Sequence, residues 1–104
     1  FMSDILLSIS IPSNNKIDLL LEALKSITSE VKANKLIEIN VSDNSGNFVN
    51  EDLILNNFKN INYYKSNKYS MDSNIDNAIR ISKGKYVSST WKQGESIEMN
   101  VVRE

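Results

Sequence analysis

The chain has 104 residues, of which 40% are hydrophobic and 24% are charged, and its formal net charge is −1. This length suits one domain or part of one, and the near-neutral charge does not predict the basic face that nucleic-acid binding requires. The sequence contains no cysteine and no histidine, so disulfides, thiolate metal sites and the commonest general base in enzymes are excluded.

The first strand is predicted over 5–11 from β-branched residues in partial alternation. We expect Pro12 to end this strand, because proline cannot donate to a ladder in a central strand. Ser13, Asn14 and Asn15 then offer capping oxygens to a helix. That helix is predicted from an apolar stripe at the helical period, made of Ile17, Leu20, Leu21, Leu24, Ile27 and Val31.

The same pattern continues along the chain. A strand is predicted over 36–41, with turn-forming residues at 42–46, then a short helix over 51–58 and a strand over 61–65. The next helix is predicted from Met71, Ile75, Ala78, Ile79 and Ile81. Gly84 stands where a helix C-terminus favours a left-handed residue. A fourth strand follows from Tyr86, and a further half-buried strand is predicted over 97–101.

Strands that alternate with helices predict an α/β fold, a Rossmann-like three-layer α/β/α arrangement with a mostly parallel sheet. We expect residues 1–104 to form one domain. Ligands of such sheets bind at the carboxyl ends of the strands, which here are the loops 12–15, 43–46, 66–72 and 88–93. The sequence has no G-x-G-x-x-G and no P-loop motif, which excludes a classical dinucleotide fold and a P-loop enzyme.

Four segments in order carry a family resemblance: ISIPSNN at 9–15, VSDNS at 41–45, NIDNAI at 74–79 and KGKYV at 83–87. Together they resemble the amino-terminal half of the family 2 glycosyltransferases of the GT-A fold, over about residues 5–87. The resemblance implies a pocket for a nucleotide-sugar, most simply of the UDP type. It implies that Pro12, Ser13 and Asn15 hold the nucleotide, that Asp43 accepts a hydrogen bond from the base, and that Asn67 and Asp72 lie near the diphosphate.

One departure from the family is large. After K-G-x-Y the family has a D-x-D motif whose carboxylates bind Mg²⁺ or Mn²⁺, but this chain has Val87-Ser88-Ser89-Thr90-Trp91. Glu95 is the first carboxylate after that strand. We therefore assign no catalytic residue and no metal ligand, and expect a truncated transferase whose 104 residues are not catalytically competent alone.

Simpler structural roles are open for several of these residues. Asp43 suits an Asx turn, Pro12 a strand end, and Asp72 a helix start favoured by the macrodipole. Trp91 suits buried packing or an oligomer contact better than stacking on a base. Asn74 and Asn77 are expected on the polar side of their helix, without a role.

The alternative function is a non-catalytic module that associates with itself. A parallel sheet that stops after four strands exposes an edge, so we expect a homo-oligomer, most simply a dimer, formed through the fourth strand or the tail at 97–102. No apolar run approaches the roughly 20 residues that span a bilayer, and no basic region precedes the first apolar run. We therefore expect a cytoplasmic protein with no membrane span.

Overall fold

The computed structural model describes residues 4–13, 17–32, 34–46, 48–66, 71–89 and 98–100. Five strands and three helices alternate along them: β1 (Leu7–Ser13), α1 (Ile17–Val31), β2 (Ile37–Asp43), α2 (Phe48–Asn57), β3 (Ile61–Lys65), α3 (Met71–Arg80), β4 (Tyr86–Ser89) and β5 (Glu98–Asn100).

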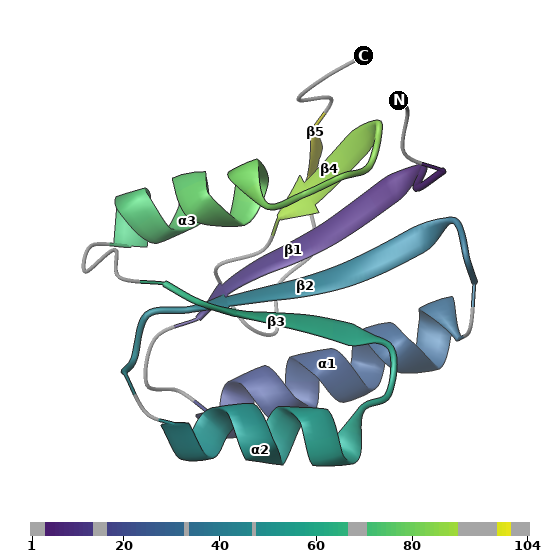
Figure 1. Ribbon diagram of the computed structural model, residues 1–104. Helices are drawn as coiled ribbons and strands as arrows, with labels where there is room; N and C mark the ends of the chain where they lie inside the picture. The colour runs from purple at the N-terminus through teal and green to yellow at the C-terminus, as the bar shows by residue number, and fades with distance from the viewer. Residues whose placement is uncertain are drawn as a thin grey trace.

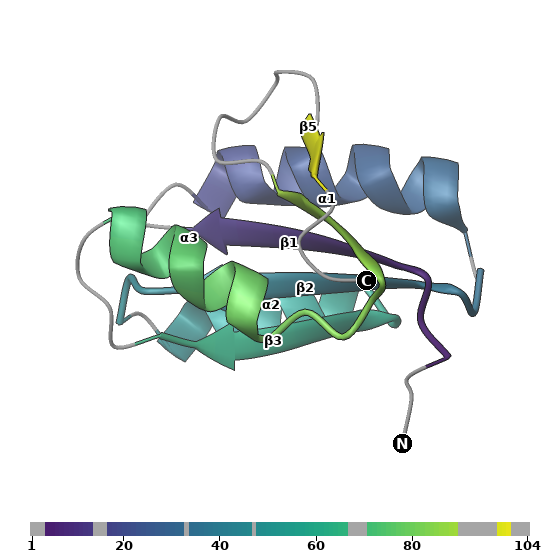
Figure 2. The same ribbon diagram turned by 90° about the horizontal axis from the view of Figure 1, so that it is seen from above.

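The strands form one sheet in the order β3-β2-β1-β4-β5, in which the first four are parallel and β5 runs antiparallel to β4. Helices α1 and α2 cover one face of the sheet and α3 covers the other (Figure 1). The view from above shows the same three layers (Figure 2). The predicted three-layer α/β fold with a mostly parallel sheet is confirmed.

Two strands run further than the sequence predicted. Pro12 does not end β1: it lies inside the strand, paired with Ser42 of β2. The described pairing of β1 with β4 stops at Ser10, so the missing N–H of Pro12 removes no bond to β4. β2 likewise continues through Asp43, which the register places beside Lys65 of β3.

The hydrophobic core lies between the sheet and the helices α1 and α2. Along β1 and β2 the odd-numbered residues face this side, and the predicted stripe of α1 packs on them. The buried members are Ile9, Ile11, Leu20, Leu24, Ile27, Ile39, Val41, Ile54 and Ile61. Burying each such side chain stabilises the fold by about 1.5–3 kcal/mol, so this layer supplies most of the apolar driving force for folding.

The opposite face of the sheet, under α3, is mostly polar, with Pro12 and Val87 as its buried apolar residues. It presents Ser8, Ser10, Glu38, Asn40 and Ser42, all of them buried. The row of α3 and its C-terminal extension that packs on this face consists of Asn74, Ala78 and Ser82. The helix predicted from this apolar pattern is present as α3, but of its described apolar residues only Ala78 is fully buried, and Ile75, Ile79 and Ile81 are partly buried. The side of α3 that packs on this polar sheet face carries polar residues such as Asn74 and Ser82, because buried polar groups need hydrogen-bond partners.

Gly84 does not end α3 in a left-handed conformation, because α3 stops at Arg80 and the positive-φ glycine among the described residues is Gly46. Gly84 is instead required by close approach. A Cβ at this position would lie 2.7 Å from the backbone nitrogen of Ser8 and 2.9 Å from the carbonyl carbon of Leu7. The backbone N–H of Gly84 donates to the Ser8 hydroxyl at 2.8 Å.

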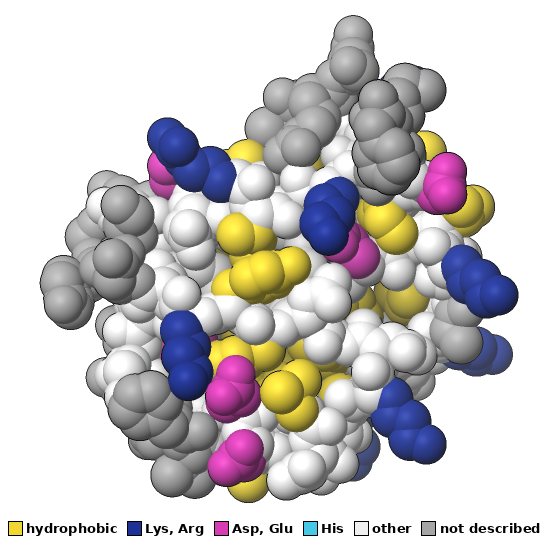
Figure 3. Space-filling model, in the orientation of Figure 1, with side chains coloured by type: hydrophobic (Ala, Val, Ile, Leu, Met, Phe, Trp, Pro, Cys, Tyr) yellow, Lys and Arg dark blue, Asp and Glu magenta, His cyan; other side chains and the backbone are white. Residues whose placement is uncertain are grey.

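β4 does not offer the free edge that the sequence suggested for self-association, because it pairs with β1 on one side and β5 on the other. The outer strands of the sheet are β3 and β5. Within the described ranges, no helix combines the length and the apolar content needed to cross a bilayer. Over the face shown in Figure 3, lysine and arginine side chains are interspersed with acidic ones.

Candidate functional site

The candidate site lies at the carboxyl ends of the parallel strands. The topological switch point of the sheet lies between β1 and β4. From β1 the chain moves outward to β2 and β3 through helices on one face, and α3 then crosses the other face to reach β4 (Figure 1). Ligands of doubly wound sheets bind outside the carboxyl ends at such a switch point. Ser13 ends β1 there, and its register partner is Asp43, the last residue of β2.

Asp43 is held by two hydrogen bonds from within the chain. Its Oδ1 accepts the backbone N–H of Ser45 at 2.9 Å, which forms an Asx turn, and its Oδ2 accepts the hydroxyl of Tyr63 from β3. The residue is only 3% exposed. The turn role weighed for Asp43 is therefore present in the structure, and the carboxylate is held in one orientation at the strand end.

Tyr63 supplies its bond as a neutral donor. Burial raises its pKa well above the ordinary tyrosine value, and the hydrogen bond to Asp43 and the charges of Asp43 and Glu51 raise it further. Glu51 in α2 also forms an ion pair with Lys65, with 3.5 Å between Oε1 and Nζ. The ends of β2 and β3 are thus joined to α2 by one polar cluster, the Asp43 cluster, made of Asp43, Tyr63, Glu51 and Lys65.

Pro12 and Ser13 lie at the end of β1 as the resemblance requires, but both are buried. The carbonyl oxygen of Ser13 accepts the backbone N–H of Asn44 at 3.1 Å and the side-chain amide of Asn74 at 3.2 Å. The backbone carbonyl of Ser13 therefore connects the end of β1 to the loop after β2 and to α3.

Asn74 is the residue that sequence reasoning missed. It is fully buried rather than on a solvated side of α3. Its Nδ2 donates to the carbonyl oxygen of Ser42 at 2.9 Å, and its Oδ1 accepts the Ser42 hydroxyl at 2.6 Å. Asn77, also expected to have no role, donates to the same hydroxyl at 2.7 Å. The signal for a polar layer was the alternation of polar with aliphatic residues, which are Ser8 and Ser10 along β1 and Glu38, Asn40 and Ser42 along β2.

The remaining predicted residues are not placed. Asn15, Asn67 and Trp91 lie outside the described residues. Asp72 belongs to the first turn of α3, and the position of its side chain is not described. The structure therefore brings Pro12, Ser13 and Asp43 together at one edge, and does not test the diphosphate contacts.

The residues present do not fit the D-x-D metal site of the glycosyltransferases that the sequence resembles. Within the described ranges, no three His, Cys, Asp or Glu side chains are grouped so that they could hold a metal ion. In the sequence, no carboxylate occurs between Tyr86 and Gly94, and hard cations such as Mg²⁺ and Mn²⁺ require oxygen ligands of that kind.

No protein-family model matches the chain, and no curated protein sequence matches it. Among solved structures, it is similar to TarS of S. aureus, a glycosyltransferase, crystallised as the segment 1–349. The TM-score is 0.67, the sequence identity is 17%, and the match covers 83% of this chain. The chain spans 27% of the TarS chain. At this identity the likeness shows the fold alone, a Rossmann-like α/β fold.

Proposed function

We propose that this chain is the nucleotide-sugar-binding portion of a glycosyltransferase, one domain over 1–104 that takes a UDP-type donor at the carboxyl edge of its sheet. The observation that carries this proposal is the fixed carboxylate of Asp43, beside Ser13 and next to the switch point. The likeness in fold to TarS supports it.

Asp43 has the chemistry to recognise uracil. An ionised carboxylate has about four acceptor positions, and the bonds from Ser45 and Tyr63 use two of them. A remaining position would accept the imide N–H of uracil, and such a charge-assisted bond contributes about 1.5–3 kcal/mol. Because Asp43 is 3% exposed, the chain around the turn at 44–46 must open for the base to reach it.

The other residues of the proposed site act at the sugar and phosphate end. Backbone groups of Pro12, Ser13 and Asn15 would hold the nucleoside, and the side-chain amide of Asn67 would donate to the diphosphate. Asp72 marks the start of α3, and a helix N-terminus of this length favours an anion such as a diphosphate. Without metal ligands the chain would bind the donor and would not transfer the sugar.

The test is calorimetric titration of the purified chain with UDP, UDP-glucose and CDP, with and without Mn²⁺. We expect saturable binding of UDP, weaker binding of CDP, whose ring N3 is an acceptor, and no effect of Mn²⁺. Asp43→Asn keeps an oxygen for the Ser45 turn but removes the charged acceptor of the Tyr63 hydroxyl, so Tyr63→Phe is the control for the loss of that bond. UDP affinity should fall about tenfold or more in Asp43→Asn and by less in Tyr63→Phe, which keeps the carboxylate.

The second candidate is a module without a nucleotide ligand, and one observation favours it: both oxygens of Asp43 already have partners within the chain. Self-association would then use β3 or β5, the outer strands of the sheet. A folded sample that binds no nucleotide and forms dimers in light scattering would favour this module. A monomer at high concentration would exclude the self-association.

A further inference from the structure

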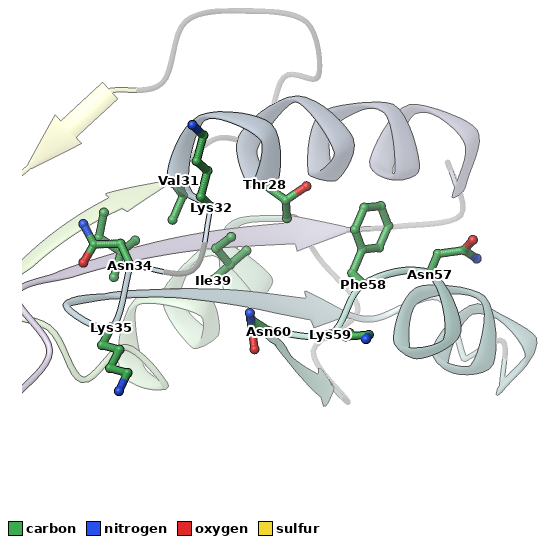
Figure 4. Close-up of a pocket in the computed structure, with 11 residues that line it drawn as sticks. Thr28, Val31, Lys32, Asn34, Lys35, Ile39, Asn57, Phe58, Lys59 and Asn60 are labelled. Atoms are coloured by element: carbon green, nitrogen blue, oxygen red, sulfur yellow. The ribbon is translucent and has the colours of Figure 1, made fainter.

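A groove opens on the face of the sheet that α1 and α2 cover. It lies near the amino ends of β2 and β3, whereas the Asp43 cluster lies at their carboxyl ends. The volume of the groove is about 540 Å³, within the range of roughly 300–1,000 Å³ typical of ligand sites. Its apolar lining consists of Val31, Ile37, Ile39 and Phe58. Ile39 is buried, whereas the other three are only partly buried, so apolar surface stays open between the ends of α1 and α2 (Figure 4).

The rim of this groove is cationic. Lys32, Lys35 and Lys59 line it together with three asparagines and a threonine, and no acidic residue does. The ion pairs found among the described residues are Lys65 with Glu51 and Arg80 with Asp76. The three rim lysines are therefore not neutralised by any acidic side chain that the structure describes.

Helix dipoles explain only part of this arrangement. Cations are favoured near helix C-termini, which accounts for Lys32 after α1 and Lys59 after α2. The dipoles do not account for Lys35 in the turn before β2, or for the open apolar lining. Lys32 also has a φ of 55°, so a long cation occupies a position whose backbone conformation favours glycine.

The placement of the lysines decides what kind of ligand fits. Figure 4 shows them on different sides of the groove, with Lys32 on the α1 side of β2 and Lys35 and Lys59 across from it. A fatty acid, with one anionic head, would satisfy one of them. We propose that the groove binds an acidic, amphipathic segment of a partner polypeptide, whose carboxylates face the three lysines and whose apolar side chains pack on Val31, Ile39 and Phe58.

The proposal is tested with a fluorescein-labelled synthetic peptide that carries leucine and phenylalanine at helical spacing between glutamates. Fluorescence anisotropy should show saturable binding to the folded chain that weakens as salt is added. One control peptide replaces the apolar residues by serine, and the other replaces the glutamates by lysine. Neither control should bind, since each lacks one of the two features that the groove offers.

The protein variants are Lys32→Glu/Lys59→Glu at the rim and, as the control, Arg80→Glu on the exposed side of α3, the helix that covers the other face of the sheet (Figure 1). The rim variant should bind the acidic peptide about tenfold more weakly, and the second variant should bind it as the parent chain does. Absence of saturable binding, binding of the lysine peptide, or equal affinity in the rim variant would overturn the proposal. Binding of dodecanoate without binding of the peptide would overturn it in favour of a single-headed amphiphile. None of these outcomes bears on nucleotide binding, which concerns the opposite edge.

Discussion

The hydroxyl of Tyr63 donates a hydrogen bond to Oδ2 of Asp43, the last residue of the neighbouring strand. The bond connects β3 to the end of β2 and, with the Ser45 amide, leaves the carboxylate one orientation. Tyr63 is thus a positioning residue for Asp43, and its removal has consequences for both stability and the proposed binding.

Tyr63→Phe should lower the free energy of unfolding by about 1–2 kcal/mol, because a hydrogen bond to a charged acceptor is lost from a half-buried site. Urea denaturation at neutral pH measures this. Tyr64→Phe, which removes a hydroxyl from the adjacent residue on the opposite face of the strand, is the control and should change stability by less than about 0.5 kcal/mol. Equal losses in the two variants would contradict the role given to the Asp43 bond.

Alkaline pH should destabilise the protein through Tyr63. Its pKa in the folded chain is raised above the ordinary value by burial and by Asp43, so between the two values the unfolded chain loses a proton that the folded chain keeps. Stability is therefore complete below about pH 10 and declines above it. Unfolding measured from pH 8 to 11 should show a steeper decline for the parent chain than for Tyr63→Phe. Identical slopes would mean that Tyr63 titrates normally.

Glu38 should be needed for the turn between α3 and β4. Its Oε2 accepts the hydroxyl of Ser8 at 2.5 Å and the backbone N–H of Lys83 at 2.7 Å. Glu38→Ala leaves the buried Ser8 hydroxyl and the part-buried Lys83 N–H without this acceptor and should cost about 2–3 kcal/mol. Glu38→Gln keeps one carbonyl oxygen and should cost less. Glu30→Ala, on the exposed side of α1, is the control and should unfold at nearly the parent urea concentration.

Two glycines should respond differently to the same substitutions. Gly84→Ala places a Cβ against the backbone of Leu7 and Ser8 and should cost about 1–3 kcal/mol by overpacking. At Gly46, φ is 73° and nothing lies within 4 Å of a built Cβ. Gly46→Ala should therefore cost about 1 kcal/mol by strain alone, and Gly46→Asn should recover most of it, since asparagine tolerates this conformation. Rescue of Gly84 by asparagine would argue against a close approach there. Thermal denaturation distinguishes these cases.

The sequence predicted the features that apolar periodicity records. The stripe of α1 stands out because every third or fourth residue is aliphatic, and the third strand was predicted with the bounds that the structure has. The row of α3 that faces the sheet was not predicted, because Asn74 and Ser82 read as surface residues until Ser8, Ser10 and Ser42 are known to lie opposite them. Hydrogen bonds between residues far apart in the sequence produce no periodic pattern from which they could be predicted.

The sequence also predicted some features of the candidate site and missed others. Four short motifs marked Ser13 and Asp43 as candidates in the loops after the first two strands, and the structure places them as register partners at the last positions of β1 and β2. The motifs did not indicate that Tyr63 would reach Asp43, because that contact depends on how β3 pairs with β2. The role expected for Gly84 at a helix C-terminus was wrong, since a glycine needed for close approach and one needed for a left-handed turn look alike in a sequence.

The polar layer under α3 has a consequence for the alignment of that helix. A helix that packs on a sheet through aliphatic side chains can slide by a fraction of a turn and keep most of its burial. α3 cannot slide in this way, because Asn74 would leave both Ser42 and Ser13 and Ser82 would leave Ser10. Any shift of α3 would leave several buried polar atoms without hydrogen-bond partners at once. The polar layer therefore allows α3 only one position on the sheet. It also fixes the distance from the start of that helix to the ends of β1 and β2.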